Sequence, residues 1–165
     1  MAGEARTEVE RPVTRRGLTR ITRMDKATPK AILLKGVEVV NPVMNSAGFR
    51  FSFEAQGRGS GGNFAWGRYL RGDRSLDLHF QHSLGLVQYH IGKDTIDHES
   101  YMRFLGIYGQ SEYPNFSTDP LDAFACLSRD LAKYCEDFLG GDGKQFREFA
   151  MRLKANPKLF KGLPA

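Results

Sequence analysis

The chain has 165 residues, of which 41% are apolar and 12% aromatic. This is enough for one hydrophobic core that needs no disulfide bonds or bound metal. No stretch approaches the roughly 20 apolar residues of a membrane-spanning helix, and the N-terminus lacks the apolar middle of a secretory signal. The net charge of +5 lies mainly in residues 1–30, with eight Lys/Arg against four Asp/Glu, so the nearly neutral remainder argues against a domain-wide nucleic-acid footprint.

The first residues differ in composition from the rest. Residues 1–26 contain few apolar side chains and show no amphipathic period, so we expect a disordered basic tail there and a single domain over residues 27–165. Three roles stay open for the tail. It is a solvated leader, a basic arm that contacts nucleic acid or an acidic partner, or a mitochondrial presequence, which four acidic residues and no serine fit badly.

The domain begins with a segment that favours a helix. Thr28 can cap it and Pro29 suits its first turn. Leu33 and Val37 then recur at helical spacing, although a glycine and several valines leave a strand as the alternative. Pro42 should end or kink the helix, because proline has no backbone N–H to donate.

Residues 49–91 predict antiparallel strands. Phe49, Phe51 and Phe53 alternate with polar residues, as in a strand with one buried face. The glycine-rich residues 57–62 favour a hairpin link over a phosphate loop, because no lysine or helix start follows them. Tight turns at residues 72–73 and 83–84 then set the pairing. The implied pairs are Ala65 with Phe80, Gly67 with Leu78 and Tyr69 with Leu76 across the first turn, and Phe80 with Val87, Leu78 with Tyr89 and Leu76 with Ile91 across the second.

Three helical segments follow the strands. Asp97 can cap a short helix that ends at Gly106, residues 119–139 carry an apolar stripe, and a last helix begins after Asp142. The sequence therefore predicts an α+β domain with an antiparallel meander of about four strands and helices packed on one face. Small Gly67 and Ala65 should leave room for the phenylalanines of the first strand.

The two cysteines do not form a disulfide framework. Cys126 and Cys135 are nine residues apart in one predicted helix, which places them about 13 Å apart along its axis on opposite sides. They cannot bridge each other, and reduced thiols predict a cytoplasmic protein. Cys126 falls off the apolar stripe, which favours an accessible spectator thiol.

The other face of the predicted sheet concentrates polar and aromatic side chains. In the predicted register Asp77 lies between Arg68 and His90 in one cross-strand row, and His79 lies between Trp66 and Gln88 in the next. Arg50, Ser52 and Glu54 should flank these rows. We call the set the polar face; its members are Trp66, Arg68, Asp77, His79, Gln88 and His90.

Ordinary solvation explains most of such a face, because a sheet covered on one side has a wet side. Trp66 favours more than this, since a large aromatic residue among polar ones is an economical anchor for a partner. We therefore expect a non-enzymatic protein-binding module, of the immunity or regulator kind, that uses the polar face. Its oligomeric state stays open.

Two other functions are weighed against binding. In a small hydrolase or transferase, Asp77 would orient His79 or His90 as general base; no nucleophile motif or cofactor motif accompanies them. The histidines also lack the spacing of zinc motifs, so no metal is expected. The third function is nucleic-acid binding through residues 1–26.

The predicted layout, a small sheet with helices on one face, resembles small bacterial immunity proteins in architecture only, without a shared motif. The resemblance implies a protein partner, such as a toxin that the immunity protein blocks. Immunity proteins are usually acidic when their toxins are basic, and the nearly neutral body of this chain departs from that pattern.

Overall fold

The computed structural model describes residues 27–163, so the predicted tail over residues 1–26 lies outside the described part. The described chain forms five strands, five α-helices and one 3-10 helix. In chain order these are α1 (Pro29–Ser46), β1 (Arg50–Gly59), β2 (Gly62–Arg71), β3 (Arg74–Phe80), β4 (Leu84–Ile91), β5 (Asp94–Asp97), α2 (His98–Phe104), η1 (Tyr108–Gln110), α3 (Asp122–Tyr134), α4 (Glu136–Leu139) and α5 (Lys144–Ala155).

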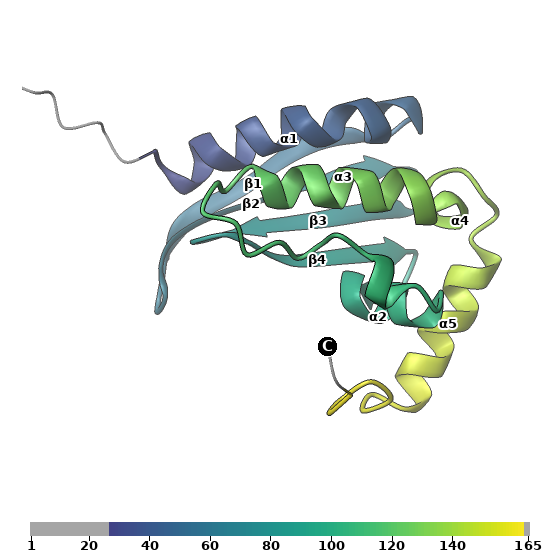
Figure 1. Cartoon of the computed structure of the whole chain (residues 1–165). Coiled ribbons are helices and arrows are strands. Elements are labelled where there is room, and N and C mark those ends of the chain that lie inside the picture. The colour runs from purple at the N-terminus through teal and green to yellow at the C-terminus, as the bar shows by residue number, and fades with distance from the viewer. Residues whose placement is uncertain (1–26, 164–165) are drawn as a thin grey trace, which may run out of the picture.

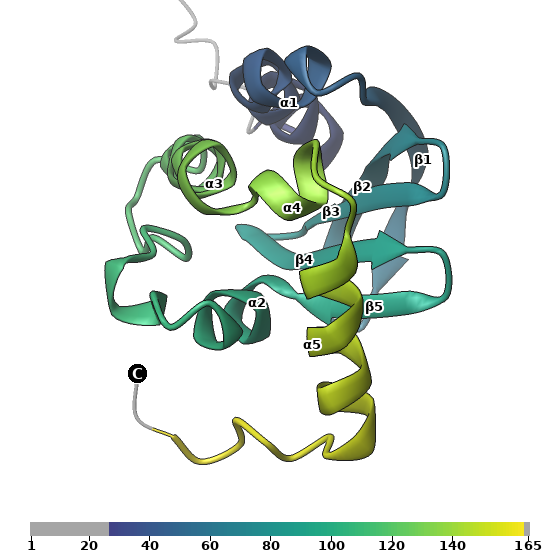
Figure 2. The same cartoon turned by 90° about the vertical axis from the view of Figure 1, so that its right-hand side faces the viewer.

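The strands form one antiparallel meander in the order β1-β2-β3-β4-β5. Helices α1, α3 and α4 lie on one side of this sheet, and α2 and α5 lie near its β5 end (Figures 1 and 2). The predicted α+β domain with helices on one face is confirmed, with five strands instead of about four. The additional strand, β5, follows a tight turn in which Gly92 has a φ of 58°, and it is only four residues long.

The core lies between the sheet and the helices. Two close approaches depend on glycine: a Cβ on Gly67 would lie 2.4 Å from the Phe51 ring, and one on Gly36 would lie 2.5 Å from the Phe124 ring. The first contact confirms that Gly67 leaves room for a phenylalanine of β1. The largest fully buried side chains are Tyr69, Tyr89, Tyr101, Phe49, Phe80, Phe124, Phe138 and Phe146.

Helix α1 begins as predicted and ends later than predicted. Thr28 accepts a hydrogen bond from the Ala31 amide at 3.2 Å, which confirms the cap. The helix continues through Pro42 to Ser46, so of the two outcomes expected at Pro42, an end or a kink, the end is wrong. Val40 and Met44, on either side of Pro42, are fully buried, and this packing outweighs the hydrogen bond that proline removes.

The predicted helix over residues 119–139 is divided into α3 and α4 at Cys135. Arg74, at the start of β3, faces α4 and is 9% exposed. Its guanidinium donates to the carbonyls of Asp137, Phe138 and Gly141. These bonds satisfy carbonyls that a helix end leaves without intrahelical partners. Within residues 27–163, no helix has both the length and the apolar character needed to cross a membrane.

Candidate functional site

The β2–β3 half of the polar face has the predicted register. Trp66 pairs with His79 and Arg68 pairs with Asp77. The two-residue turn between the strands fixes their register, and Gly72 in this turn has the positive φ that a tight hairpin turn requires. The side chains on this half therefore lie in the predicted cross-strand rows.

The β3–β4 half differs from the predicted register by two residues. Asp77 pairs with Gln88 instead of His90, and His90 pairs with Ser75. The connection is longer than a two-residue turn, because Leu84 already pairs with Phe80, and a bulge follows between Leu78 and Phe80. A shift of two residues keeps every side chain on its predicted face, so His90 and Gln88 still belong to the polar face.

Asp77 is the centre of the polar face. Its Oδ2 lies 3.1 Å from an Arg68 guanidinium nitrogen and 3.2 Å from His90 Nε2. The Arg68 guanidinium carbon lies 5.0 Å from the centroid of the Trp66 ring, within the range of a cation–π contact. Arg68 pairs with Asp77 as predicted, whereas the predicted row with His90 opposite Asp77 is wrong and His90 reaches Asp77 diagonally.

The members of this cluster keep contact with solvent. The side chains of Arg68, Asp77 and His90 are 34%, 17% and 24% exposed, and Trp66 is half-buried. Arg68 Nε and Asp77 Oδ1 are shielded from solvent and have no hydrogen-bond partner among the described residues. The polar face thus has unused hydrogen-bonding capacity next to Trp66.

The histidines do not gather into one site. The His79 ring stacks on Phe64 with centroids 5.4 Å apart, and His82 contacts the Gly61 carbonyl at the far hairpin. Both ring nitrogens of His90 are engaged, with Asp77 and with Thr95 Oγ1 at 2.9 Å. A general base accepts a proton from a group hydrogen-bonded to its unprotonated nitrogen, and at Nδ1 of His90 that group is the Thr95 hydroxyl, so a substrate would have to displace this hydroxyl for His90 to act on it. Within residues 27–163, no three His, Cys, Asp or Glu side chains could hold a metal ion.

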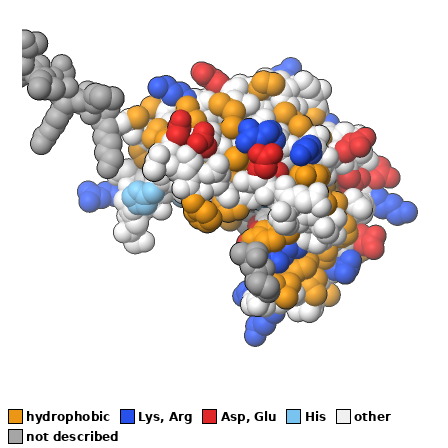
Figure 3. Space-filling view, in the orientation of Figure 1, with side chains coloured by type: hydrophobic (Ala, Val, Ile, Leu, Met, Phe, Trp, Pro, Cys, Tyr) orange, Lys and Arg blue, Asp and Glu red, His pale blue; other side chains and the backbone are white. Residues whose placement is uncertain are grey.

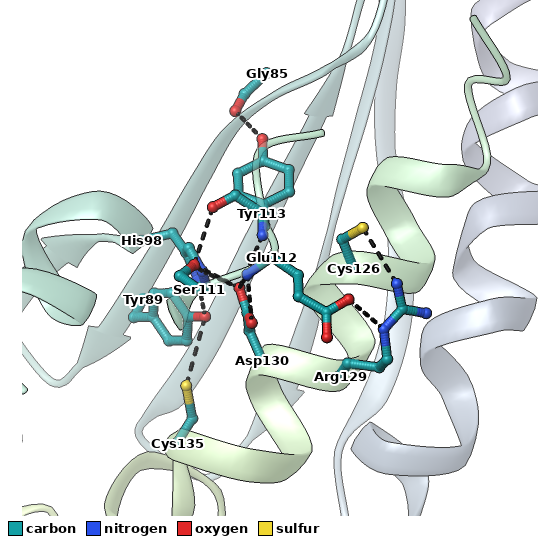
Figure 4. A network of polar contacts seen from close by, with 10 residues as sticks. All are labelled: Gly85, Tyr89, His98, Ser111, Glu112, Tyr113, Cys126, Arg129, Asp130 and Cys135. Atoms are coloured by element: carbon teal, nitrogen blue, oxygen red, sulfur yellow. Dashed lines mark hydrogen bonds and ion pairs between the residues drawn. The ribbon is translucent and has the colours of Figure 1, made fainter. Parts of the chain in front are cut away.

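A second polar cluster, which the sequence analysis did not predict, lies between the sheet and α3 (Figure 4). His98 Nε2 is 3.1 Å from Asp130 Oδ2, and His98 Nδ1 is 2.7 Å from the Tyr89 hydroxyl. His98 is 3% exposed and Asp130 is fully buried. We call Tyr89, His98, Ser111 and Asp130 the buried cluster.

Asp130 holds the loop between η1 and α3 against the sheet. Its carboxylate accepts hydrogen bonds from the Ser111 hydroxyl at 2.6 Å and from the amides of Glu112 and Tyr113. Burial alone would raise the pKa of Asp130, but the hydrogen bonds from His98, Ser111 and these amides outweigh it and lower that pKa below its ordinary 3.8. An ionised Asp130 fits a His98 ring that donates from Nε2 and accepts the Tyr89 proton at Nδ1.

Both cysteines are buried and free. Cys135 Sγ lies 3.8 Å from the Tyr89 hydroxyl, and burial raises the pKa of its thiol to about 12. The prediction of an accessible Cys126 is wrong, because the loop before α3 covers it. Asn115 Nδ2 and an Arg129 nitrogen each lie 3.4 Å from its sulfur.

One signal could have indicated the buried cluster. Asp130 follows Leu127 by three residues and precedes Leu131, so it lies on the apolar stripe of α3. A carboxylate at such a position needs several buried donors. His98 begins α2, and nothing in its neighbourhood in the sequence indicates contact with the other histidines or with α3.

Comparisons with models of protein families, with curated proteins and with solved structures find no match for this chain. Its function must therefore be inferred from the side chains described above.

Proposed function

We propose that the protein is a non-enzymatic binding module, of the immunity or regulator kind, that acts in the cytoplasm and holds a protein partner on its polar face. One observation carries the proposal. Within residues 27–163, no helix lies over this face of the sheet, and the face carries Trp66 in contact with Arg68.

The composition of the face supports binding. Tryptophan and arginine are the residues that most often dominate the energy of protein interfaces. Asp77 fixes the Arg68 guanidinium beside the Trp66 ring, so less side-chain freedom is lost when a partner binds. Leu70 of β2 and Leu86 of β4 are 43% and 51% exposed and would extend the contact with apolar surface.

The unpartnered atoms support a polar contact at the same place. Arg68 Nε can donate and Asp77 Oδ1 can accept, and neither has a partner among residues 27–163. A small movement of the two side chains would present both atoms to a partner. Each charge-assisted hydrogen bond made there would contribute about 1.5–3 kcal/mol.

The experiment uses Trp66, which is the only tryptophan in the chain. The full chain is first immobilised, and partners are captured from the native cells. A captured partner is then titrated against the free chain. The partner should contain no tryptophan, or its tryptophans should be labelled so that they do not contribute to the emission. We expect the Trp66 emission to shift as the complex forms, because binding excludes water from the indole ring.

Matched variants assign the surface. The double variant Trp66→Ala, Arg68→Ala should weaken binding by about thirtyfold or more, as for hot-spot residues. The control Leu34→Ala, Lys35→Ala changes exposed residues of α1 on the opposite side of the sheet and should bind as wild type. Capture of the same partners with equal affinity by both variants would show that the polar face is not the binding surface.

A further inference from the structure

The last strand of the sheet has a free edge. β5 pairs with β4 on one side, and no strand within residues 27–163 pairs with its other side. The N–H and C=O groups of a free strand edge can pair with an added extended chain. Asp94, Thr95 and Asp97 of β5 line a groove of about 610 Å³, which we call the β5 groove.

The β5 groove has an apolar wall that suits the side chains of an added strand. Ala150 and Leu153 of α5 contribute to it, together with Pro157 and Phe160. Figures 1 and 2 both show the C-terminal stretch, which carries Pro157 and Phe160, passing below α2. In an added strand, alternate side chains would point to this wall, and the volume is that of an ordinary ligand pocket.

Cations outnumber unpaired carboxylates in the β5 groove by three to two. Glu99 is paired with Arg103 at 3.0 Å, and the two carboxylates without a cation partner in the described part of the chain are Asp94 and Asp97. Asp97 is turned toward α2, where it accepts hydrogen bonds from Ser100. The side-chain ammonium groups of the three lysines, by contrast, have no ion pair or hydrogen bond among residues 27–163; these lysines are Lys93, Lys154 and Lys161.

From these observations we infer that the β5 groove binds an extended acidic segment of a partner protein. The segment adds a strand beside β5, places apolar side chains against Leu153 and Phe160, and directs carboxylates to the lysines. This site lies on other residues than the polar face around Trp66, and it does not depend on the function proposed for that face.

The test uses the full chain and a short synthetic peptide in which glutamate and valine alternate. Binding is followed by the backbone amide signals in NMR spectra. We expect saturable shifts centred on Asp94–Asp97, with a Kd of about 1 mM or tighter. Two control peptides should bind at least about tenfold more weakly: one has lysine in place of glutamate, and one carries methylated backbone nitrogens that cannot donate to a strand.

Charge-reversal variants locate the site. Lys93→Glu, Lys154→Glu should weaken binding of the acidic peptide about tenfold or more, whereas Lys35→Glu on α1 should not change it. The variant Trp66→Ala, Arg68→Ala should bind the peptide as wild type does, so failure of one proposal is distinguishable from failure of the other.

Three results would overturn the inference. The first is no saturable binding of the acidic peptide. The second is equal binding of the backbone-methylated peptide, which would show that no strand is added. The third is that a single-stranded oligothymidylate shifts the same amide signals and the peptide does not. If the charge-reversal variants also abolish that shift, the groove is a nucleic-acid site.

Discussion

Two histidine–aspartate pairs of nearly equal length lie on opposite faces of the sheet. On the polar face, His90 Nε2 is 3.2 Å from Asp77; in the buried cluster, His98 Nε2 is 3.1 Å from Asp130. Asp130 uses both oxygens and is fully buried, whereas Asp77 uses one oxygen and remains partly exposed. The same two residue types therefore form a fully satisfied buried anchor in one place and a partly exposed pair with an unused oxygen in the other.

The surroundings of the pairs explain the difference. Asp130 connects three segments, because its partners come from α2 and from the loop that follows η1. Tyr113 of that loop also donates its hydroxyl proton to the carbonyls of Leu84 and Gly85 in β4. Figure 3 shows the face of the molecule on which α3 and this loop lie, where hydrophobic and charged side chains are interspersed. Asp77, in contrast, connects only neighbouring strands that already share backbone hydrogen bonds.

The largest expected effect is the loss of the buried carboxylate. Asp130→Ala should lower the free energy of unfolding by about 3–5 kcal/mol, because four donors lose a buried charged acceptor. Urea denaturation followed by circular dichroism measures the loss. Asp130→Asn is the control for volume and should lose less, since its amide keeps one acceptor oxygen. A loss below about 1 kcal/mol in Asp130→Ala would remove the distinction between the two pairs.

A smaller effect should appear on acidification. The folded-state pKa of Asp130 lies below its ordinary 3.8, so the unfolded chain takes up this proton first as the pH falls. The contribution of ionised Asp130 to stability is therefore complete above the ordinary pKa of 3.8. It is lost as the pH falls from 3.8 through the lower pKa of the folded state. The free energies of unfolding of wild type and Asp130→Ala can be measured with urea from about pH 5 to about pH 2.5. The difference between them should become smaller as the pH falls through this range. A difference that stays constant would contradict the lowered pKa.

Removing the hydroxyl of Tyr89 should cost about 1 kcal/mol, because His98 Nδ1 then lacks its buried donor. Tyr108→Phe is a matched control, since the Tyr108 ring contacts Arg103 and its hydroxyl has no hydrogen bond to residues 27–163. That control should change stability by less than about 0.5 kcal/mol. Equal losses in the two variants would mean that Tyr89 contributes only through its ring.

The two pairs also differ in how far the sequence could predict them. Alternation along β2 and β3, with a two-residue turn between them, is enough to place Arg68 beside Asp77. His90 was assigned to the right face but to the wrong partner, because a bulge and a longer connection are not visible in the alternation of β4. Strand β5 was missed because four residues are too few to show a period.

The buried cluster could not be predicted in the same way. His98 and Asp130 are 32 residues apart and lie on α2 and α3. Their contact depends on how two helices pack on the sheet, and neither helix has a pattern that specifies its neighbour. Pro42 shows the same limit, because burial of Val40 and Met44 against the core overrides a local signal that would otherwise end α1.

The smallest effect on stability is expected at Asp77, and it tests most directly whether the two histidine–aspartate pairs differ in role. Asp77→Ala removes a partly exposed ion pair that solvent can replace, so the loss should stay below about 1 kcal/mol. The Trp66 emission should nevertheless change, because Arg68 is then no longer held beside the indole ring. Urea denaturation followed through that emission measures both quantities in one experiment. A loss as large as that of Asp130→Ala would make Asp77 a second structural anchor, and the polar face would then serve the fold instead of a partner.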